Sequence, residues 1–216
     1  MLKTNVKASN ITNLTDARYF AAWEVEWLGF NFEQGSENYI APQSMKAIKE
    51  WVEGVKFVGE FPFASAEDIH AAVEALELDA IQVGMFTEVD VLEKLDNVTV
   101  IKEVVISAEV DEVSLENHLN LYASQVEYFL LSFEKNGTTW EMLKSGERQI
   151  SVAAFEKICA QYKIILSIDL SQDALEEILK IPNLYGLNVK GGEEEKVGVK
   201  SFDELDEIFE ALEILV

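Results

Sequence analysis

Short apolar runs that alternate with helical patterns constrain the fold of this chain more than any other feature. Runs such as Phe129–Leu131 and Ile164–Leu166 are continuously apolar, which is typical of parallel strands buried on both faces. We predict strands at Asn5–Ala8, Trp27–Asn31, Lys56–Glu60, Ala80–Val83, Val98–Ile106, Tyr128–Ser132, Ile164–Ile168 and Tyr185–Val189.

The segments between these runs have the periodicity of amphipathic helices. Apolar residues recur at i, i+3, i+4 and i+7 in Ile69–Leu76 and in Leu205–Leu212, which predicts one buried stripe on each helix. Ser65 is followed three residues later by Asp68, a spacing that resembles a capping box, and Ser171 stands where a helix N-cap is expected.

Strand and helix alternate through the whole chain without a linker or a low-complexity segment. Dividing 216 residues among eight strand–helix units gives 27 residues for each unit. This favours an α/β fold, a parallel eight-stranded (β/α)8 TIM barrel at the compact end of its size range, formed by one domain over residues 1–216. A doubly wound open sheet remains the alternative, because periodicity alone does not separate the two folds.

Composition narrows the classes of partner. The chain has 17 Lys and Arg residues against 40 Asp and Glu residues, a net charge of −23, which would repel nucleic acid and an anionic membrane surface. The chain has no apolar run near the roughly 18 residues that cross a bilayer, nor a start that resembles a signal peptide, so we expect a cytoplasmic protein.

Cys159 is the only cysteine, which excludes an intrachain disulfide. We expect the Cys159 side chain to be buried as a small hydrophobic group and not to act as a nucleophile.

Five segments spread along the chain are similar to known sequence motifs. Val6–Arg18 resembles VKICGIT-N-L-x-D-A, and Leu28–Phe32 with Ser36–Pro42 resembles LGF-x-F followed by SPRY-[IV]-x-P. The remaining similar segments are Ile81–Gly84 against VQLHG, Phe129–Ser132 against LLLD, and Gly186–Lys200 against GVDVSSGVE through PGVKD. Together these motifs resemble one family, the phosphoribosylanthranilate isomerases of tryptophan biosynthesis, which are small (β/α)8 barrels.

The resemblance implies an Amadori rearrangement of a phosphorylated aminoaldose, yet the residues that would perform it differ here. The family's general base is the Cys of KICG and its general acid is the Asp of LLLD; these positions are Ser9 and Ser132. A serine hydroxyl needs a neighbouring base to act as one near neutral pH. Neither His70 nor His118 falls at a strand end. The Arg of SPRY is Asn38 in this chain.

The family's phosphate loops are altered as well. The segments Asn136–Thr139 and Ser167–Leu170 stand where the family has glycine-rich turns, whose role is to let backbone amides approach a phosphate. Lys190 with Gly191 and Gly192 keeps a candidate anion turn after the last strand, but Glu193–Glu195 follows immediately. A solvated loop is the more frequent role of such a segment.

In a barrel the functional end is where strands stop and βα loops begin. The family resemblance implies that Ser9 and Ser132 stand at the catalytic positions, and we expect both to be inactive as serines. Glu60 and Asp169 are additional carboxylates at strand ends, and Lys102 and Glu103 lie within the fifth strand; acid–base work and a structural ion pair both remain open for such groups. The ligand-binding candidates are Asn31, Asn38, Glu60, Gln82, Asp169, Lys190, Gly191 and Gly192.

Three hypotheses for function follow. The first is a divergent barrel that has lost isomerase activity and binds a small molecule or a protein partner at the carboxyl ends of the strands. The second is a working isomerase with rewired acid and base residues, and the third is a barrel enzyme with another small-molecule substrate. We expect no cofactor, no metal, no nucleic acid and no membrane. The expected ligand is a small molecule, phosphorylated or not, and the expected state is a monomer or a homodimer.

Overall fold

The computed structural model describes residues 1–191, 194–196 and 199–214. Eight parallel strands close into a barrel in the order β1 to β8, with β8 hydrogen-bonded to β1. The barrel is therefore confirmed, and the open sheet is excluded because β1 and β8 are neighbours. The strands are β1 (Asn5–Ser9), β2 (Trp27–Asn31), β3 (Lys56–Phe61), β4 (Ala80–Val83), β5 (Thr99–Val105), β6 (Tyr128–Ser132), β7 (Ile164–Ser167) and β8 (Gly186–Lys190).

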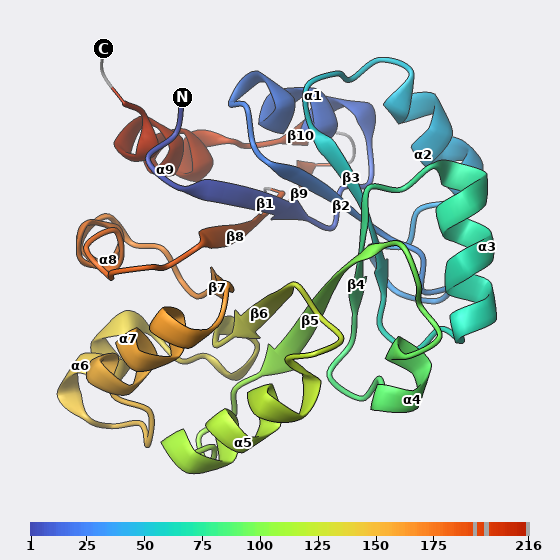
Figure 1. Ribbon diagram of the computed structural model, residues 1–216. Coiled ribbons are helices and arrows are strands. Elements are labelled where there is room, and N and C mark those ends of the chain that lie inside the picture. The colour runs from blue at the N-terminus through green and yellow to red at the C-terminus, as the bar shows by residue number, and fades with distance from the viewer. Residues whose placement is uncertain (192–193, 197–198, 215–216) are drawn as a thin grey trace.

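Helices surround the barrel and separate consecutive strands (Figure 1). All eight predicted strands are present, with ends that differ by one residue at most. The helices are α1 (Leu14–Ala22), α2 (Pro42–Lys49), α3 (Ala66–Leu76), α4 (Val89–Leu92), α5 (Glu112–Tyr122), η1 (Glu134–Asn136), α6 (Trp140–Ser145), α7 (Val152–Gln161), α8 (Gln172–Ile178) and α9 (Asp203–Leu212).

The predicted helix starts are confirmed, although their capping differs in detail. Ser65 is the N-cap of α3, and its Oγ accepts a hydrogen bond from the backbone N–H of Asp68 at 3.2 Å and donates to Asp68 Oδ2 at 2.8 Å. Ser171 is the N-cap of α8, but its side chain makes no capping hydrogen bond. The predicted apolar stripe of α9 is also confirmed, because Leu205, Phe209 and Leu212 are buried.

The chain after β8 forms a feature that the apolar pattern does not predict. β9 (Glu194–Lys196) and β10 (Val199–Lys200) pair antiparallel before α9. Residues near the amino terminus lie beside α9, where the backbone N–H of Lys3 donates to the carbonyl of Leu212 at 2.8 Å (Figure 1). In the described part of the chain, no helix is long and apolar enough to cross a membrane.

Side chains inside the barrel form an apolar layer near the amino ends of the strands. Because strand residues alternate between two faces, every second residue points inward. Six such residues from β2 to β7 form a buried cluster that is separate from the main core between the barrel and the helices. They are Trp27, Val58, Ala80, Ile101, Leu130 and Ile165.

Candidate functional site

The next inward position of each of these strands lies closer to the carboxyl end, and it is polar or glycine. This change from apolar to polar within two residues defines the barrel mouth. Since the carboxyl ends of barrel strands form the functional face in this fold, the mouth is the candidate site. These next positions are Gly29, Glu60, Gln82, Glu103, Ser132 and Ser167.

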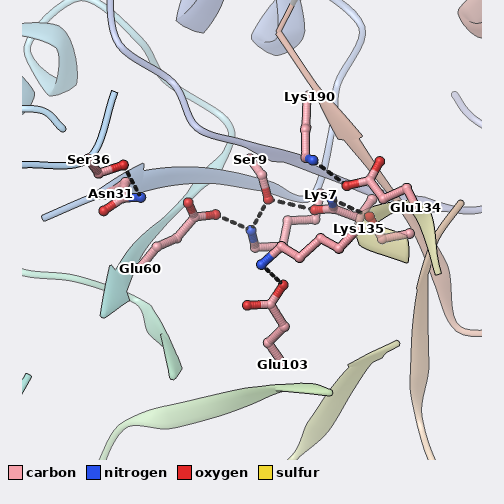
Figure 2. A network of polar contacts seen from close by, with 11 residues as sticks. Lys7, Ser9, Asn31, Ser36, Glu60, Glu103, Glu134, Lys135 and Lys190 are labelled. Atoms are coloured by element: carbon pink, nitrogen blue, oxygen red, sulfur yellow. Dashed lines mark hydrogen bonds and ion pairs between the residues drawn. The ribbon is translucent and has the colours of Figure 1, made fainter. Parts of the chain in front are cut away.

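A chain of hydrogen bonds crosses the mouth from β3 to β7. Lys7 Nζ on β1 lies 2.5 Å from Glu60 Oε1 and 2.5 Å from Ser9 Oγ. Ser9 Oγ donates to Asn188 Oδ1 on β8 at 2.6 Å, and Asn188 Nδ2 donates to Ser167 Oγ on β7 at 3.1 Å. Figure 2 shows Lys7 between Glu60 and Ser9. All five side chains are buried, so the chain is rigidly held.

These contacts decide what Ser9 can do chemically. Its hydroxyl accepts from an ammonium group and donates to an amide oxygen, and an amide oxygen does not take a proton near neutral pH. Lys7 resembles the lysine of a Ser–Lys catalytic pair, in which a neutral amine removes the serine proton. Here Lys7 Nζ donates hydrogen bonds to both Glu60 Oε1 and Ser9 Oγ, so in this arrangement it does not accept the serine proton. The geometry gives Ser9 a structural hydrogen-bonding role.

Gly29 on β2 provides the space for this ion pair. A Cβ atom at this position would lie 2.1 Å from Glu60 Oε1 and 2.8 Å from Lys7 Nζ. Both distances are below those that real Cβ atoms show, so the buried pair and a side chain at position 29 exclude each other. The absence of a side chain at Gly29, the glycine of the LGF motif, therefore leaves the space that the Lys7–Glu60 pair occupies.

Ser132 lies beside this chain without joining it. It occupies the end of β6, directly opposite Ser167 in the strand register, and it is 1% exposed. Ser132 Oγ and Gln82 Oε1 are both buried atoms for which the described residues provide no hydrogen-bond partner. Two unpaired polar atoms in one mouth are unusual, because buried polar groups are nearly always hydrogen-bonded.

Two consecutive residues of the β6–α6 loop cross the mouth above β6. Glu134 forms an ion pair with Lys190 at the end of β8, and Lys135 Nζ lies 2.5 Å from Glu103 Oε1 on β5. The two contacts point in opposite directions (Figure 2). We call Glu134–Lys135 the strap. Lys190 therefore faces the mouth, and its charge is balanced by a carboxylate.

The β2–α2 loop holds two other candidates at the edge of the mouth. Asn31 Nδ2 donates to Ser36 Oγ at 3.3 Å (Figure 2), and Asn31 Oδ1 accepts from the backbone N–H of Glu33 at 2.8 Å. The backbone N–H of Asn38 also donates to Ser36 Oγ. Asn31 thus shapes its own loop, and both residues are half-buried.

The structure places Asp169 away from the mouth cluster. Its exposed side chain lines surface hollows next to α8, which residues of α6 and α9 also border. Gly191 follows β8 directly and is half-buried, whereas Gly192 and Glu193 lie outside the described residues. Asp169 is therefore not brought together with Glu60 and Gln82.

The predicted loss of the phosphate loop after β6 has a geometric counterpart. The backbone N–H groups of Asn136 and Thr138 donate to the carbonyl of Phe133, and that of Gly137 donates to the carbonyl of Glu134. These amides are already used within the loop and do not point at a common anion position. Gly84, directly after β4, stands where the resemblance implies the His of VQLHG. A Cβ at Gly84 would lie 2.4 Å from the carbonyl oxygen of Pro62, so a histidine would not fit in this backbone arrangement.

Lys102 does not belong to the mouth, although Glu103 does, because adjacent strand residues face opposite sides. Its buried ammonium group donates to the carbonyls of Gly84, Met85 and Thr87 at 2.9, 3.2 and 3.0 Å and lies 4.3 Å from the ring centre of Tyr122. Burial lowers the pKa of Lys102 to about 8. Lys102 thus anchors the β4–α4 loop from outside the barrel.

Two further groups outside the mouth have shifted pKa values. Burial, followed by the charge of Lys102, lowers the pKa of His118 on α5. Burial and then the nearby Glu156 raise the pKa of Cys159 to about 12, and the predicted burial of this thiol is confirmed. Among the described residues, no group of three His, Cys, Asp or Glu side chains is placed to hold a metal ion.

Comparisons with known proteins identify the family of the chain and agree with its barrel fold. The family model described as N-(5'phosphoribosyl)anthranilate (PRA) isomerase matches residues 6–211. The chain belongs to this family. The N-(5'-phosphoribosyl)anthranilate isomerase of Caldanaerobacter subterraneus subsp. tengcongensis is 25% identical over 213 residues, which cover 95% of this chain and 96% of the relative. The family resemblance predicted from the motifs is confirmed.

Solved structures of this family share the fold. The phosphoribosyl anthranilate isomerase from Thermotoga maritima superimposes with a TM-score of 0.77 at 23% identity, over 97% of this chain and 98% of that chain. A second phosphoribosyl anthranilate isomerase structure, in complex with reduced 1-(o-carboxyphenylamino)-1-deoxyribulose 5-phosphate, has a TM-score of 0.74 at 23% identity with the same coverage. The isomerase barrel is thus retained along the chain.

Several residues of the mouth were not singled out from the sequence. Lys7, Ser167 and Asn188 each lie two residues from another inward-facing residue, so counting alternate positions from a known interior residue would have found them. Glu134 and Lys135 lie in η1, a single turn that is too short to show a periodicity, and only the folded chain shows their partners.

Proposed function

We propose that this member of the phosphoribosylanthranilate isomerase family binds a small molecule at the barrel mouth and does not catalyse the family's rearrangement. The observation that carries the proposal is the hydrogen bonding of Ser9, which donates to Asn188 and accepts from the ion-paired Lys7. Ser9 consequently has no base to remove its proton. Ser132, at the acid position implied by the resemblance, has a hydroxyl group that does not release a proton near neutral pH.

The size of the expected loss follows from general acid–base catalysis. A positioned acid or base contributes roughly 10²–10⁴-fold to a rate, so the absence of both predicts a loss of at least about 10⁴-fold. The mouth contains buried polar atoms without a hydrogen-bond partner among the described residues, which supports the binding of a ligand there. A barrel that bound nothing would be more stable with apolar side chains at these positions.

A steady-state assay with phosphoribosylanthranilate tests this proposal. We expect no turnover by the wild type above the uncatalysed rate, beside an active isomerase of the family under the same conditions. The double variant Ser9→Cys/Ser132→Asp serves as a second arm. Turnover that appears only in the double variant would support the proposal and assign the loss to the acid and base alone.

Turnover by the wild type would overturn the proposal and favour the rewired isomerase. Glu60 is the group for that alternative, because it is a buried carboxylate next to Lys7 in the mouth. In that event Glu60→Gln should abolish the measured turnover, whereas Asp169→Asn, outside the mouth, should leave it unchanged.

A further inference from the structure

Two buried polar atoms of the mouth point to the chemistry of its ligand. Ser132 Oγ on β6 and Gln82 Oε1 on β4 lack a hydrogen-bond partner within the described residues. Ser132 follows Leu130 by two residues and Gln82 follows Ala80 by two, and both of these belong to the interior apolar cluster. The two side chains therefore face the barrel interior, on the two strands that flank β5.

The unpaired atoms require a donor. An amide oxygen such as Gln82 Oε1 only accepts hydrogen bonds, while a serine hydroxyl both donates and accepts. A ligand hydroxyl group satisfies both atoms, because it carries one hydrogen and two lone pairs. An ionised phosphate or carboxylate oxygen has no hydrogen to donate to Gln82 Oε1.

The charges of the mouth lead to the same conclusion. Each lysine that the structure describes in the mouth is already paired: Lys7 with Glu60, Lys135 with Glu103, and Lys190 with Glu134. An anionic ligand would have to break one of these pairs and leave a carboxylate unbalanced, and the first pair is buried. An uncharged ligand needs no such exchange.

The strap lies next to these features, at the carboxyl end of β6. Glu134 and Lys135 reach β8 and β5, on either side of β6, so Ser132 lies at the end of the strand between their two ion pairs. In the two ion pairs of the strap, the side chain of Lys135 is 45% exposed and that of Lys190 is 42% exposed. Ser132 is only 1% exposed. The mouth thus has two partly solvated ion pairs at its rim, whereas the uncharged Ser132 and the Lys7–Glu60 pair are buried.

We propose that the mouth binds an uncharged polyhydroxy compound of the sugar or polyol class, with Ser132 and Gln82 hydrogen-bonded to its hydroxyl groups. This inference rests on the proposed binding function and adds the ligand class. It separates this chain from the solved family member whose bound ligand carries a 5-phosphate.

Matched pairs of probes test the proposal on the intact chain. Ribose with ribose 5-phosphate, and ribulose with ribulose 5-phosphate, are titrated separately while the amide signals of the strand ends are followed by NMR. We expect the neutral member of at least one pair to bind about tenfold more tightly than its phosphate. We also expect Ser132→Ala and Gln82→Leu each to weaken that binding about fivefold, the effect of one lost hydrogen bond.

Controls make the outcome decisive. Asp169→Asn should leave binding unchanged, and thermal unfolding should verify that Ser132→Ala and Gln82→Leu remain folded. Tighter binding of a phosphate than of its parent sugar, no binding of any neutral probe, or neutral binding that is insensitive to both variants would overturn the proposal. A phosphate bound without turnover of phosphoribosylanthranilate would refute the ligand class alone and leave the loss of isomerase activity intact.

Discussion

Lys7 Nζ lies 2.5 Å from Glu60 Oε1 inside the barrel, and the two side chains are 0% and 5% exposed. The ion pair joins β1 to β3 through the interior and holds Ser9 by a further hydrogen bond. Removing only one residue of such a buried ion pair is strongly destabilising, because the remaining charge stays buried without its partner.

Removing Glu60 should therefore destabilise the protein strongly. We expect Glu60→Ala to lower the free energy of unfolding by about 3–5 kcal/mol, measured by urea denaturation. The double variant Lys7→Met/Glu60→Leu should recover most of this loss, since it replaces both charges with apolar groups. A single variant within about 0.5 kcal/mol of wild type would contradict the role of the pair.

Gly29 should tolerate no side chain while the ion pair is present. We expect Gly29→Ala to destabilise by about 1–3 kcal/mol, as overpacked interior positions do, because the new Cβ would meet Glu60 Oε1 at 2.1 Å. In the Glu60→Ala background the same substitution should cost clearly less. Equal costs in both backgrounds, measured as a double-mutant cycle by urea denaturation, would show that Glu60 is not the obstacle.

Lys102 should make the stability of the protein rise with pH in one window. Its pKa is about 8 in the folded chain against an ordinary value of 10.5. Between these values the unfolded chain binds more protons, so stability increases with pH. The cost of burying the charge is fully present below pH 8 and disappears as pH approaches 10.5.

The comparison with Lys102→Met isolates this contribution, because groups that titrate in both proteins cancel in the difference. The free energy of unfolding of wild type relative to the variant should increase from about pH 8 to 10.5, measured by urea denaturation at a series of pH values. A flat difference across this window would show that the pKa of Lys102 is not lowered.

Cys159 should be unreactive in the folded protein. Burial raises the pKa of its thiol to about 12, so little reactive thiolate is present at pH 8, and the side chain is inaccessible. We expect labelling by a disulfide reagent only in denaturant. The control Ala153→Cys/Cys159→Ala places a thiol at an exposed position of the same helix and should react at once; equally fast labelling of the wild type would contradict burial.

Much of the fold follows from the sequence for a clear physical reason. A strand buried on both faces must be apolar along its length, so runs such as Phe129–Leu131 mark strands directly. Closure of the barrel does not follow from such runs, because it depends on pairing between β1 and β8, whose partners, such as Asn5 and Gly186, are 181 residues apart. Periodicity describes neighbours along the chain, and it contains no information about that contact.

The candidate site was predictable only in part. Ser9, Glu60, Gln82 and Ser132 were selected as strand ends and are brought together in the mouth, whereas Asp169, selected by the same rule, lies on the outer surface. It follows the last residue of β7 by two positions, where the chain has already left the strand and alternation no longer fixes the direction of a side chain.

The sequence by itself determined the alternation of strands and helices and the family, and it led to the proposal that Ser9 and Ser132 occupy the base and acid positions. Only the tertiary structure decided which charges meet. Lys7 pairs with Glu60, and the strap pairs with β5 and β8, because barrel closure brings side chains from distant strands within hydrogen-bonding distance. The chemistry of the mouth depends on those distances, which local sequence does not contain.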